Sequence, residues 1–159
     1  MDYINWQSEK EKFMMEALKQ ARKAYNLEEV PVGAVIVKDG KIIARAYNQK
    51  EIKKDTTKHA EIIAIQKASK KLNAWRLTGC DLYVTLEPCA MCAGAIIQSR
   101  ISNVYIGAMD AKTGCCGSVC NLFDDYKFNH HVNSENGICE EECSKILKDF
   151  FRDLRKGQL

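Results

Sequence analysis

Segments with helix-like and strand-like hydrophobic spacing alternate along this sequence. The chain opens with a helical pattern from Ser8 to Tyr25, in which apolar residues recur at intervals of three and four. Two β-branched runs follow, Val32 to Lys38 and Lys41 to Ala46, and the dipeptide Asp39-Gly40 between them is a typical hairpin turn. The sequence therefore predicts one helix and an antiparallel pair of strands at the start of the fold.

Helices and strands continue to alternate beyond the hairpin. Thr56 or Thr57 can cap a second helix, and Pro88 suits the first position of a third. The second helix ends near Leu72 and the third near Ser99. Three further strands are predicted at 81–86, 103–108 and 128–132, and a last helix at 140–155. Residues 112–120 have no clear hydrophobic period and are predicted to form a loop. This order predicts an α/β fold, a three-layer α/β/α sandwich with a central mixed five-stranded sheet.

Length and apolar content favour a single soluble domain. With 159 residues, we expect residues 1–159 to form one domain. Apolar runs such as Val32 to Val37 are far shorter than the roughly 20 residues that cross a membrane, and the first residues lack the pattern of a secretion signal. In such a chain, the eight cysteines are more often reduced thiols or metal ligands than disulfides. We therefore expect a cytoplasmic protein that does not enter a membrane.

Positive charge is concentrated in two stretches. The net charge of +3 is unremarkable, but residues 50–71 contain seven lysines and three acids. Residues 145–156 contain five lysines and arginines and two acids. Both stretches can meet a polyanion.

Three potential metal ligands lie at the predicted starts of two helices. His59 opens one helix, and Cys89 and Cys92 lie three residues apart at the start of the other, so both thiols face one side. The positive end of a helix favours thiolate, and zinc itself removes thiol protons. One nitrogen and two sulfur ligands leave the fourth tetrahedral position for water, as in catalytic zinc sites. The sequence therefore predicts one Zn²⁺ per chain, held by these three residues.

An acid–base residue is predicted beside the metal. Glu61 lies two residues after His59, roughly 200° further around the helix. It can border the same pocket and reach water there without binding the ion. A carboxylate in that position can take a proton from water and deliver it to a ring nitrogen and a departing amine. We expect Glu61 to be the catalytic residue.

Each of these residues has a simpler explanation when taken alone. A Cys-x-x-Cys pair also serves redox and structural metal sites, and a single histidine or glutamate near a helix start is usually a solvated residue. Together they form His-x-Glu, a gap of 29 residues between His59 and Cys89, and Pro-Cys-x-x-Cys where a strand gives way to a helix. That combination is similar to the signature of zinc-dependent nucleobase deaminases.

The wider sequence resembles the cytidine deaminase-like superfamily and, within it, the bacterial tRNA-specific adenosine deaminases. The resemblance covers nearly the whole chain. It includes Glu29-Val-Pro-Val-Gly-Ala-Val, Ala44-Arg-Ala-Tyr-Asn48, Trp75-Arg-Leu, the run from Leu82 to Ala95, the run from Gly107 to Gly114, Asn121-Leu, Phe128-Asn-His and Lys148-Asp-Phe-Phe-Arg. The metal pattern identifies the superfamily, whereas the flanking segments and the last helix favour the tRNA branch.

The resemblance implies a cytidine deaminase-like fold and a set of substrate contacts. Asn48 would hydrogen-bond a flipped-out nucleotide, Ala60 would offer backbone contacts above the metal, and Asp110 would contact a ribose of the anticodon loop. On the last helix, Phe151 and Arg152 can supply an aromatic and a cationic surface for unpaired bases. The resemblance also implies a homodimer that binds a tRNA anticodon stem-loop and converts its wobble adenosine to inosine.

Two other functions remain open at this point. The same chemistry can act on a free base or nucleoside of the guanine or cytosine type, although the basic stretches and residues 110–114 argue against it. The chain can also be a zinc-stabilised RNA-binding module without catalysis, against which Glu61 argues. Five further cysteines have no role from the pattern and form either a second metal site or, more simply, reduced thiols: Cys115, Cys116, Cys120, Cys139 and Cys143.

Overall fold

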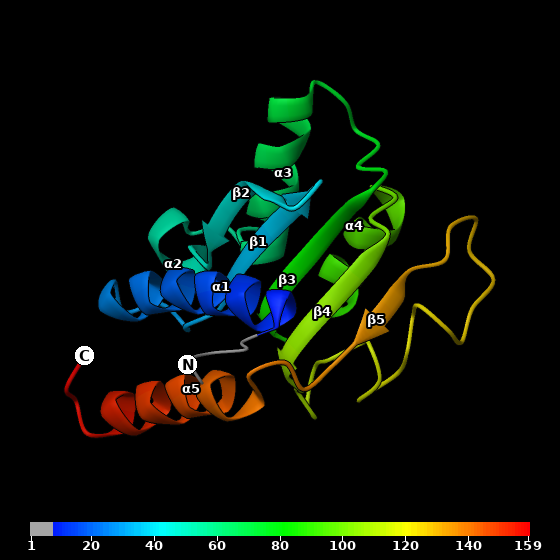
Figure 1. The fold of residues 1–159 in the computed structure, drawn as a ribbon. Coiled ribbons are helices and arrows are strands. Elements are labelled where there is room, and N and C mark those ends of the chain that lie inside the picture. Colours follow the sequence, from blue (N-terminus) through cyan, green and yellow to red (C-terminus); the bar gives the residue numbers. More distant parts are fainter. Residues whose placement is uncertain (1–7) are drawn as a thin grey trace, which may run out of the picture.

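One mixed sheet with helices on both faces forms the structure, a computed structural model that describes residues 8–159 (Figure 1). Its elements are α1 (Glu9–Asn26), β1 (Gly33–Lys38), β2 (Lys41–Tyr47), α2 (Lys50–Lys53), α3 (Ala60–Leu72), β3 (Cys80–Leu86), α4 (Ala90–Gln98), β4 (Asn103–Ala108), β5 (Asn133–Glu135) and α5 (Glu140–Arg155). The five strands lie in the order β2-β1-β3-β4-β5. The β1 strand is antiparallel to β2 and β3, whereas β3, β4 and β5 run parallel. The predicted fold class is confirmed.

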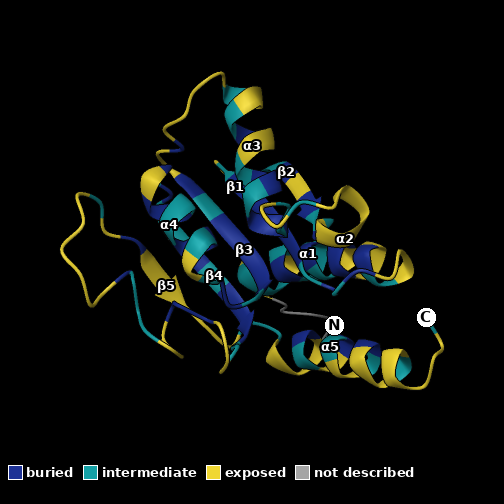
Figure 2. Cartoon of the chain, turned by 180° about the vertical axis from the view of Figure 1, so that it is seen from behind, coloured by how far each residue is buried: buried dark blue, intermediate teal, exposed yellow. Residues whose placement is uncertain are grey.

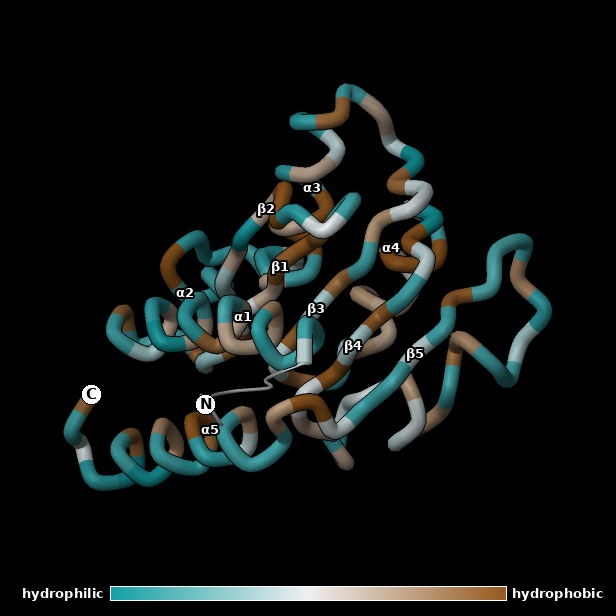
Figure 3. The backbone as a smooth tube through the Cα atoms, viewed as in Figure 1, coloured by the Kyte–Doolittle hydropathy of each residue, from teal (hydrophilic) through white to brown (hydrophobic). Residues whose placement is uncertain are grey.

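The sheet is apolar on both faces because helices cover both. In β1, Ala34 and Ile36 point into the cluster shared with α3 and α4, whereas Val35 and Val37 point into the cluster shared with α1 and α5. This alternation follows from the two-residue period of a strand. The central strands are accordingly buried and hydrophobic along most of their length (Figures 2 and 3). Among the described helices, none has the length and apolar character needed to cross a membrane.

The α1 helix packs directly on β1, where Gly33 permits a very close approach. A Cβ atom at Gly33 would lie 2.0 Å from the carbonyl oxygen of Ala17 and 2.5 Å from the amide nitrogen of Ala21. Ser8 caps the helix, since its hydroxyl accepts a hydrogen bond from the amide of Glu11 at 3.2 Å. The predicted first helix is therefore present, and it packs closely on Gly33 at the start of β1.

Two predicted helix starts are wrong by a few residues. Neither threonine caps α3, which has His59 as its N-cap, and Thr57 bonds instead to an aspartate two residues earlier. Pro88 lies before α4, whose N-cap is Cys89. The carbonyl of Pro88 accepts a hydrogen bond from the amide of Cys115 at 2.9 Å, a tertiary contact.

The fifth strand is also misplaced by the sequence pattern. The apolar residues at 128–132 predict it there, but β5 begins at Asn133 and all three of its residues are exposed. Phe128 is half exposed, and Val132 is buried directly before the strand. The β5 strand is a polar edge that pairs with β4 through its backbone, so its position cannot follow from hydrophobic spacing (Figure 3).

Candidate active site

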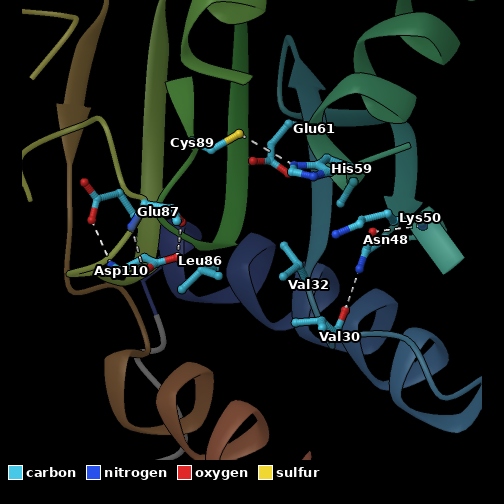
Figure 4. Close-up of a pocket in the computed structure, with 12 residues that line it drawn as sticks. Val30, Val32, Asn48, Lys50, His59, Glu61, Leu86, Glu87, Cys89 and Asp110 are labelled. Atoms are coloured by element: carbon cyan, nitrogen blue, oxygen red, sulfur yellow. Dashed lines mark hydrogen bonds between the residues drawn. The ribbon is translucent and has the colours of Figure 1, made fainter. Parts of the chain in front are cut away.

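Two helix starts bring three potential metal ligands together, and Figure 4 shows two of them, His59 and Cys89. His59 and Cys89 are the N-caps of α3 and α4, both with extended backbone, and Cys92 lies in the first turn of α4. The Nδ1 atom of His59 lies 3.7 Å from Sγ of Cys89 and 3.5 Å from Sγ of Cys92. All three ligand atoms lie within 4.8 Å of one another. The predicted ligand set therefore meets in space.

The spacing of these atoms fits a tetrahedral metal ion. Bonds of about 2.3 Å to sulfur and about 2.0 Å to nitrogen place such ligand atoms about 3.5 Å apart at a tetrahedral angle. The two nitrogen–sulfur distances, 3.7 and 3.5 Å, are close to that value. Two thiols and one imidazole are also the donor types that zinc prefers. The donor types and both nitrogen–sulfur distances therefore fit a metal site.

The same residues perturb one another electrostatically. The pKa of the Cys89 thiol is lowered to about 4, because Cys92 and then His59 hydrogen-bond to its sulfur. The pKa of Cys92 is raised by its hydrogen bond to Cys89 and by burial. The pKa of His59 is raised chiefly by its hydrogen bond to Cys89. These contacts favour the thiolate form of Cys89, which is the form that binds a metal ion.

Glu61 lies beside the ligands but outside the ligand group. Its side chain is 4% exposed and lines the same cavity as His59 and Cys89 (Figure 4). Burial raises the pKa of its carboxyl group, and His59 opposes that increase. The carboxylate is thus placed to act on a molecule in the cavity.

A cavity of about 170 Å³ opens next to this group. It is smaller than the roughly 300–1,000 Å³ clefts that hold drug-sized ligands, which suits a single planar ring system. It combines apolar walls with polar groups from two sides, and its lining residues are Val30, Val32, Asn48, Lys50, His59, Ala60, Glu61, Leu86, Glu87, Cys89, Asp110 and Thr113.

Asn48 and Ala60 lie on the α2 and α3 side of the cavity. The side-chain amide of Asn48 donates to the carbonyl of Val30 at 3.1 Å, and its oxygen accepts from the amide of Lys50 at 3.1 Å. These bonds fix the carboxamide and leave one N–H and one lone pair for a ligand. Ala60 is fully buried as the first residue of α3. Both predicted contact residues therefore border the cavity.

Asp110 lies on the opposite side, at the start of a structured loop (Figure 4). Its carboxylate accepts hydrogen bonds from the amides of Lys112 and Thr113 at 3.0 and 3.3 Å, and from the Thr113 hydroxyl at 2.7 Å. Burial would raise the pKa of Asp110, but the bonds to Thr113 and Lys112 outweigh it and lower the pKa. This turn fixes the loop at the edge of the cavity.

Glu87 holds that loop in place, a role that the sequence interpretation missed. Its side chain is 3% exposed, and its carboxylate accepts hydrogen bonds from the amides of Asp110, Cys116 and Ser118 at 2.8, 2.9 and 3.0 Å. The Ser118 hydroxyl donates a further bond. A Cβ atom at Gly114 would lie 2.2 Å from Cδ of Glu87. The sequence contains a signal for this role. Glu87 directly follows an apolar strand and precedes Pro-Cys, and an acid in such a buried setting is either functional or hydrogen-bonded.

Glu29 has the corresponding role on the other side of the cavity. Its side chain is fully buried, and its two oxygens accept the amides of Glu51 and Ile52 at 2.9 and 3.0 Å. These amides lie in α2, a short helix that the sequence pattern did not predict. Four residues are too few for a hydrophobic period, so the tertiary bond to Glu29 specifies this helix.

Phe151 and Arg152 lie apart from the cavity. Neither lines it, and both belong to α5, which packs on α1 and β4. Phe151 is 40% exposed. The guanidinium of Arg152 pairs with Asp149 and Asp153 at 3.1 and 3.2 Å. The structure therefore does not bring these two predicted contact residues to the site within one chain.

The remaining cysteines do not form a second site of this kind. All eight cysteines are free thiols. Among residues 8–159, the group at His59, Cys89 and Cys92 is the one set of three or more potential ligands found close together. Burial raises the pKa of Cys115 to about 11 and of Cys143 to about 12, which keeps both protonated at neutral pH.

Comparison with protein families and curated relatives points to one group of enzymes. The family model described as MafB19-like deaminase matches residues 8–155. The tRNA-specific adenosine deaminase of Bacillus subtilis (strain 168) is 51% identical over 146 residues, which cover 92% of this chain and 91% of the relative. The tRNA-specific adenosine deaminase of Aquifex aeolicus (strain VF5) is 49% identical over 148 residues, which cover 93% of this chain and 97% of the relative.

Solved structures give the same picture. A structure from a study of A-to-I editing by tRNA:A34 deaminases at the wobble position has a TM-score of 0.83 and 46% identity, covering 86% of this chain and 99% of that one. A guanine deaminase structure from Nitrosomonas europaea has a TM-score of 0.74 at 22% identity, and the match covers 88% of this chain and 83% of that one. The second match shows a shared fold alone.

Proposed function

The chain belongs to the tRNA-specific adenosine deaminases, and we propose from this membership that it converts the wobble adenosine of a tRNA anticodon loop to inosine and ammonia. The observation that carries the proposal is the buried Glu61 next to three converging ligand atoms in a cavity that suits one ring system. A structural metal site needs neither that carboxylate nor that cavity.

The proposed cofactor is one zinc ion per chain, held by His59, Cys89 and Cys92. The donor types and the distances of 3.7 and 3.5 Å support this assignment. Three protein ligands match a catalytic site with one open position. When bound, zinc supplies Lewis-acid activation of the attacking water.

Glu61 is the proposed catalytic residue. Its carboxylate takes a proton from the water that attacks C6 of adenine and delivers it to the ring nitrogen N1. Glu61 then takes the proton of the hydroxyl group now on C6 and passes it to the amino group; the C6–N bond breaks, so water and adenosine give inosine and ammonia. The carboxylate lies in the cavity wall and outside the ligand group, which supports a role in moving protons and argues against metal binding.

Three residues are proposed to position the extruded nucleotide. Asn48 presents one free N–H and one lone pair from a fixed carboxamide. Ala60 offers its backbone at the start of α3, and Asp110 borders the cavity from the opposite loop. Phe151 and Arg152 remain proposed contacts for a more distant part of the stem-loop, because they lie outside the cavity.

The proposed partners follow from the substrate. A tRNA anticodon stem-loop is the proposed partner, and a homodimer is proposed from the family resemblance. A tRNA substrate and eight free thiols fit a cytoplasmic location. The single deaminase domain over residues 1–159 likewise remains a prediction.

Product analysis tests the proposed function. Zinc-loaded protein is incubated with an anticodon stem-loop that contains the wobble adenosine and, in parallel, with free adenosine, guanine and cytosine. We expect inosine in the stem-loop at a rate far above that of any free compound. Deamination of a free base at an equal or higher rate, without inosine in the stem-loop, would refute the proposal.

A further inference from the structure

Four lysines lie on or beside α2, and one of them borders the cavity. Lys50 lines the cavity itself, Lys53 and Lys54 are exposed at the end of α2, and half-buried Lys58 directly precedes His59. We define the α2 surface as these lysines, Lys50, Lys53, Lys54 and Lys58. Figure 2 shows α2 projecting into solvent next to the start of α3.

The α2 surface is not neutralised within the chain. The same segment contains two acids, and Asp55 is bonded to Thr57 at 2.7 Å. In the part of the chain that the structure describes, none of the four lysines forms a salt bridge. Arg152 on α5 differs, because two carboxylates already pair with it. The lysines of the α2 surface therefore carry positive charge without a salt-bridge partner in the described chain, whereas Arg152 on α5 is already paired.

The position of α2 is fixed rather than adaptable. The carboxylate of Glu29, fully buried, accepts the amides of Glu51 and Ile52 at 2.9 and 3.0 Å. Asn48 accepts the amide of Lys50 at 3.1 Å. These bonds hold the backbone that carries Lys50 and Lys53 in place before any ligand arrives.

We propose that the α2 surface binds backbone phosphates of the RNA strand that flank the nucleotide in the cavity. This inference rests on the proposed function and specifies how the site recognises a polynucleotide. A free base carries no phosphate and gains nothing from these lysines, whereas an RNA strand with one nucleotide in the cavity beside Lys50 carries phosphates that the α2 surface can contact. Binding energy from such remote contacts favours the polynucleotide substrate.

A matched pair of double variants tests the inference. Lys53→Gln/Lys54→Gln removes two charges from the α2 surface. Lys70→Gln/Lys71→Gln removes two adjacent charges from the last turn of α3, which is also exposed and basic. Lys70 and Lys71 follow Ala60, which lines the cavity, by ten and eleven residues of α3, which is about 15–17 Å along the helix at about 1.5 Å per residue. Both pairs change the same net charge at a helix end.

Binding of the stem-loop is measured for the wild type and both variants as salt increases, together with inosine formation. Each phosphate contact on a single strand contributes about 0.7 to the slope of log affinity against log salt. We expect Lys53→Gln/Lys54→Gln to lower that slope by about 1.4 and to weaken binding at low salt. Lys70→Gln/Lys71→Gln should leave both unchanged.

Equal losses from the two pairs, or no loss from either, would overturn the α2 surface as a phosphate site. A change in oligomeric state in Lys53→Gln/Lys54→Gln with unchanged RNA binding would also overturn it, and would assign these lysines to a protein interface. Failure of the proposed function is a separate result, because it appears as absence of inosine with the wild-type protein.

Discussion

At the scale of single residues, Glu61 has an environment that costs stability. A carboxylate that is only 4% exposed loses most of its hydration, and burial raises its pKa. Such groups persist where function requires them. Glu87 and Glu29 are equally buried, but amides of distant segments bond to both of them. Glu87 and Glu29 therefore hold the cavity walls, whereas Glu61 borders the cavity beside the ligand group.

Replacing Glu61 should separate catalysis from metal binding. In Glu61→Ala, we expect the rate of inosine formation to fall by at least about 10²–10⁴-fold, the usual contribution of a general acid–base group. Zinc content should remain that of the wild type, because Glu61 lies outside the ligand group. Single-turnover kinetics and metal analysis measure the two quantities. Cys89→Ala serves as the contrast and should lose zinc; substantial activity in zinc-loaded Glu61→Ala would refute the catalytic role.

Adding one methyl group at Gly114 should destabilise the protein. The new Cβ would lie 2.2 Å from Cδ of Glu87 and 2.6 Å from the carbonyl oxygen of Asp110. We expect Gly114→Ala to lower the free energy of unfolding by about 1–3 kcal/mol, as overpacking usually does. Urea denaturation measures this change.

Gly94→Ala is the matched control for Gly114→Ala. Within the chain, nothing lies within 4 Å of a Cβ at Gly94, which is in α4. Alanine has the higher helix propensity, so this variant should be as stable as the wild type or more stable, by up to about 1 kcal/mol. Similar losses in both variants would show that Glu87 does not impose the glycine at 114.

At the scale of elements, sequence patterns predicted what hydrophobic spacing encodes and missed what polar contacts encode. The helix from Ser8 and the strands of the central sheet follow from their periods, because each buries a regular face. The α2 helix depends on Glu29, and the start of α4 depends on the carbonyl of Pro88. Such contacts join distant parts of the chain and leave no local period.

The dependence of α2 on Glu29 predicts a change in hydrogen exchange. In Glu29→Gln, the side chain loses its negative charge and one of its two acceptor oxygens. Its hydrogen bonds to the amides of α2, worth about 1.5–3 kcal/mol, therefore weaken. We expect the amides of Glu51 and Ile52 to exchange about 10- to 100-fold faster. The neighbouring Glu28 accepts no bond from α2 in the structure, and Glu28→Gln should leave these rates unchanged. Equal protection in Glu29→Gln and the wild type would contradict this account of α2.

The turn at Asp110 predicts a pH dependence of stability. Hydrogen bonds lower the pKa of Asp110 below its ordinary 3.8, so the folded state favours the charged form. That stabilisation is complete above about pH 4 and disappears as pH falls through the folded-state value. In metal-free protein, the difference in unfolding free energy between wild type and Asp110→Asn should therefore shrink as pH falls below about 4. Urea titrations at several pH values measure it, and a constant difference would contradict the assignment.

At the scale of the whole molecule, the site is assembled from four separate segments. His59 precedes α3, Cys89 follows β3, Asn48 follows β2, and Asp110 follows β4. Residue types and spacing predicted that His59, Cys89 and Cys92 converge with Glu61 beside them, because that pattern is local within each segment. The cavity walls could not be predicted in this way, since Glu29 and Glu87 act across 22 and 31 residues.

Removal of metal should lower the stability of the whole domain, because the ligands connect α3 to α4. Zinc at about 100 times its dissociation constant adds about 2.7 kcal/mol to the folded state. For a chain of this size, that corresponds to a Tm about 5–10 °C higher than after chelation. Differential scanning calorimetry with and without chelator measures the shift. Cys92→Ser is the control and should respond weakly to zinc; an unchanged Tm in the wild type would contradict a link through the metal.

The way in which the cavity walls are anchored has a consequence for divergence among related enzymes. Glu29 and Glu87 bond to backbone amides, and only Ser118 adds a side-chain hydroxyl. The exposed side chains of α2 and of the loop after Asp110 are therefore free to change without moving the walls that carry them. A library of variants randomised at these positions should retain folded members at high frequency while its substrate preference varies. Because Glu29 and Glu87 hold the backbone, the scaffold tolerates substitutions at the exposed positions where a new substrate preference would arise.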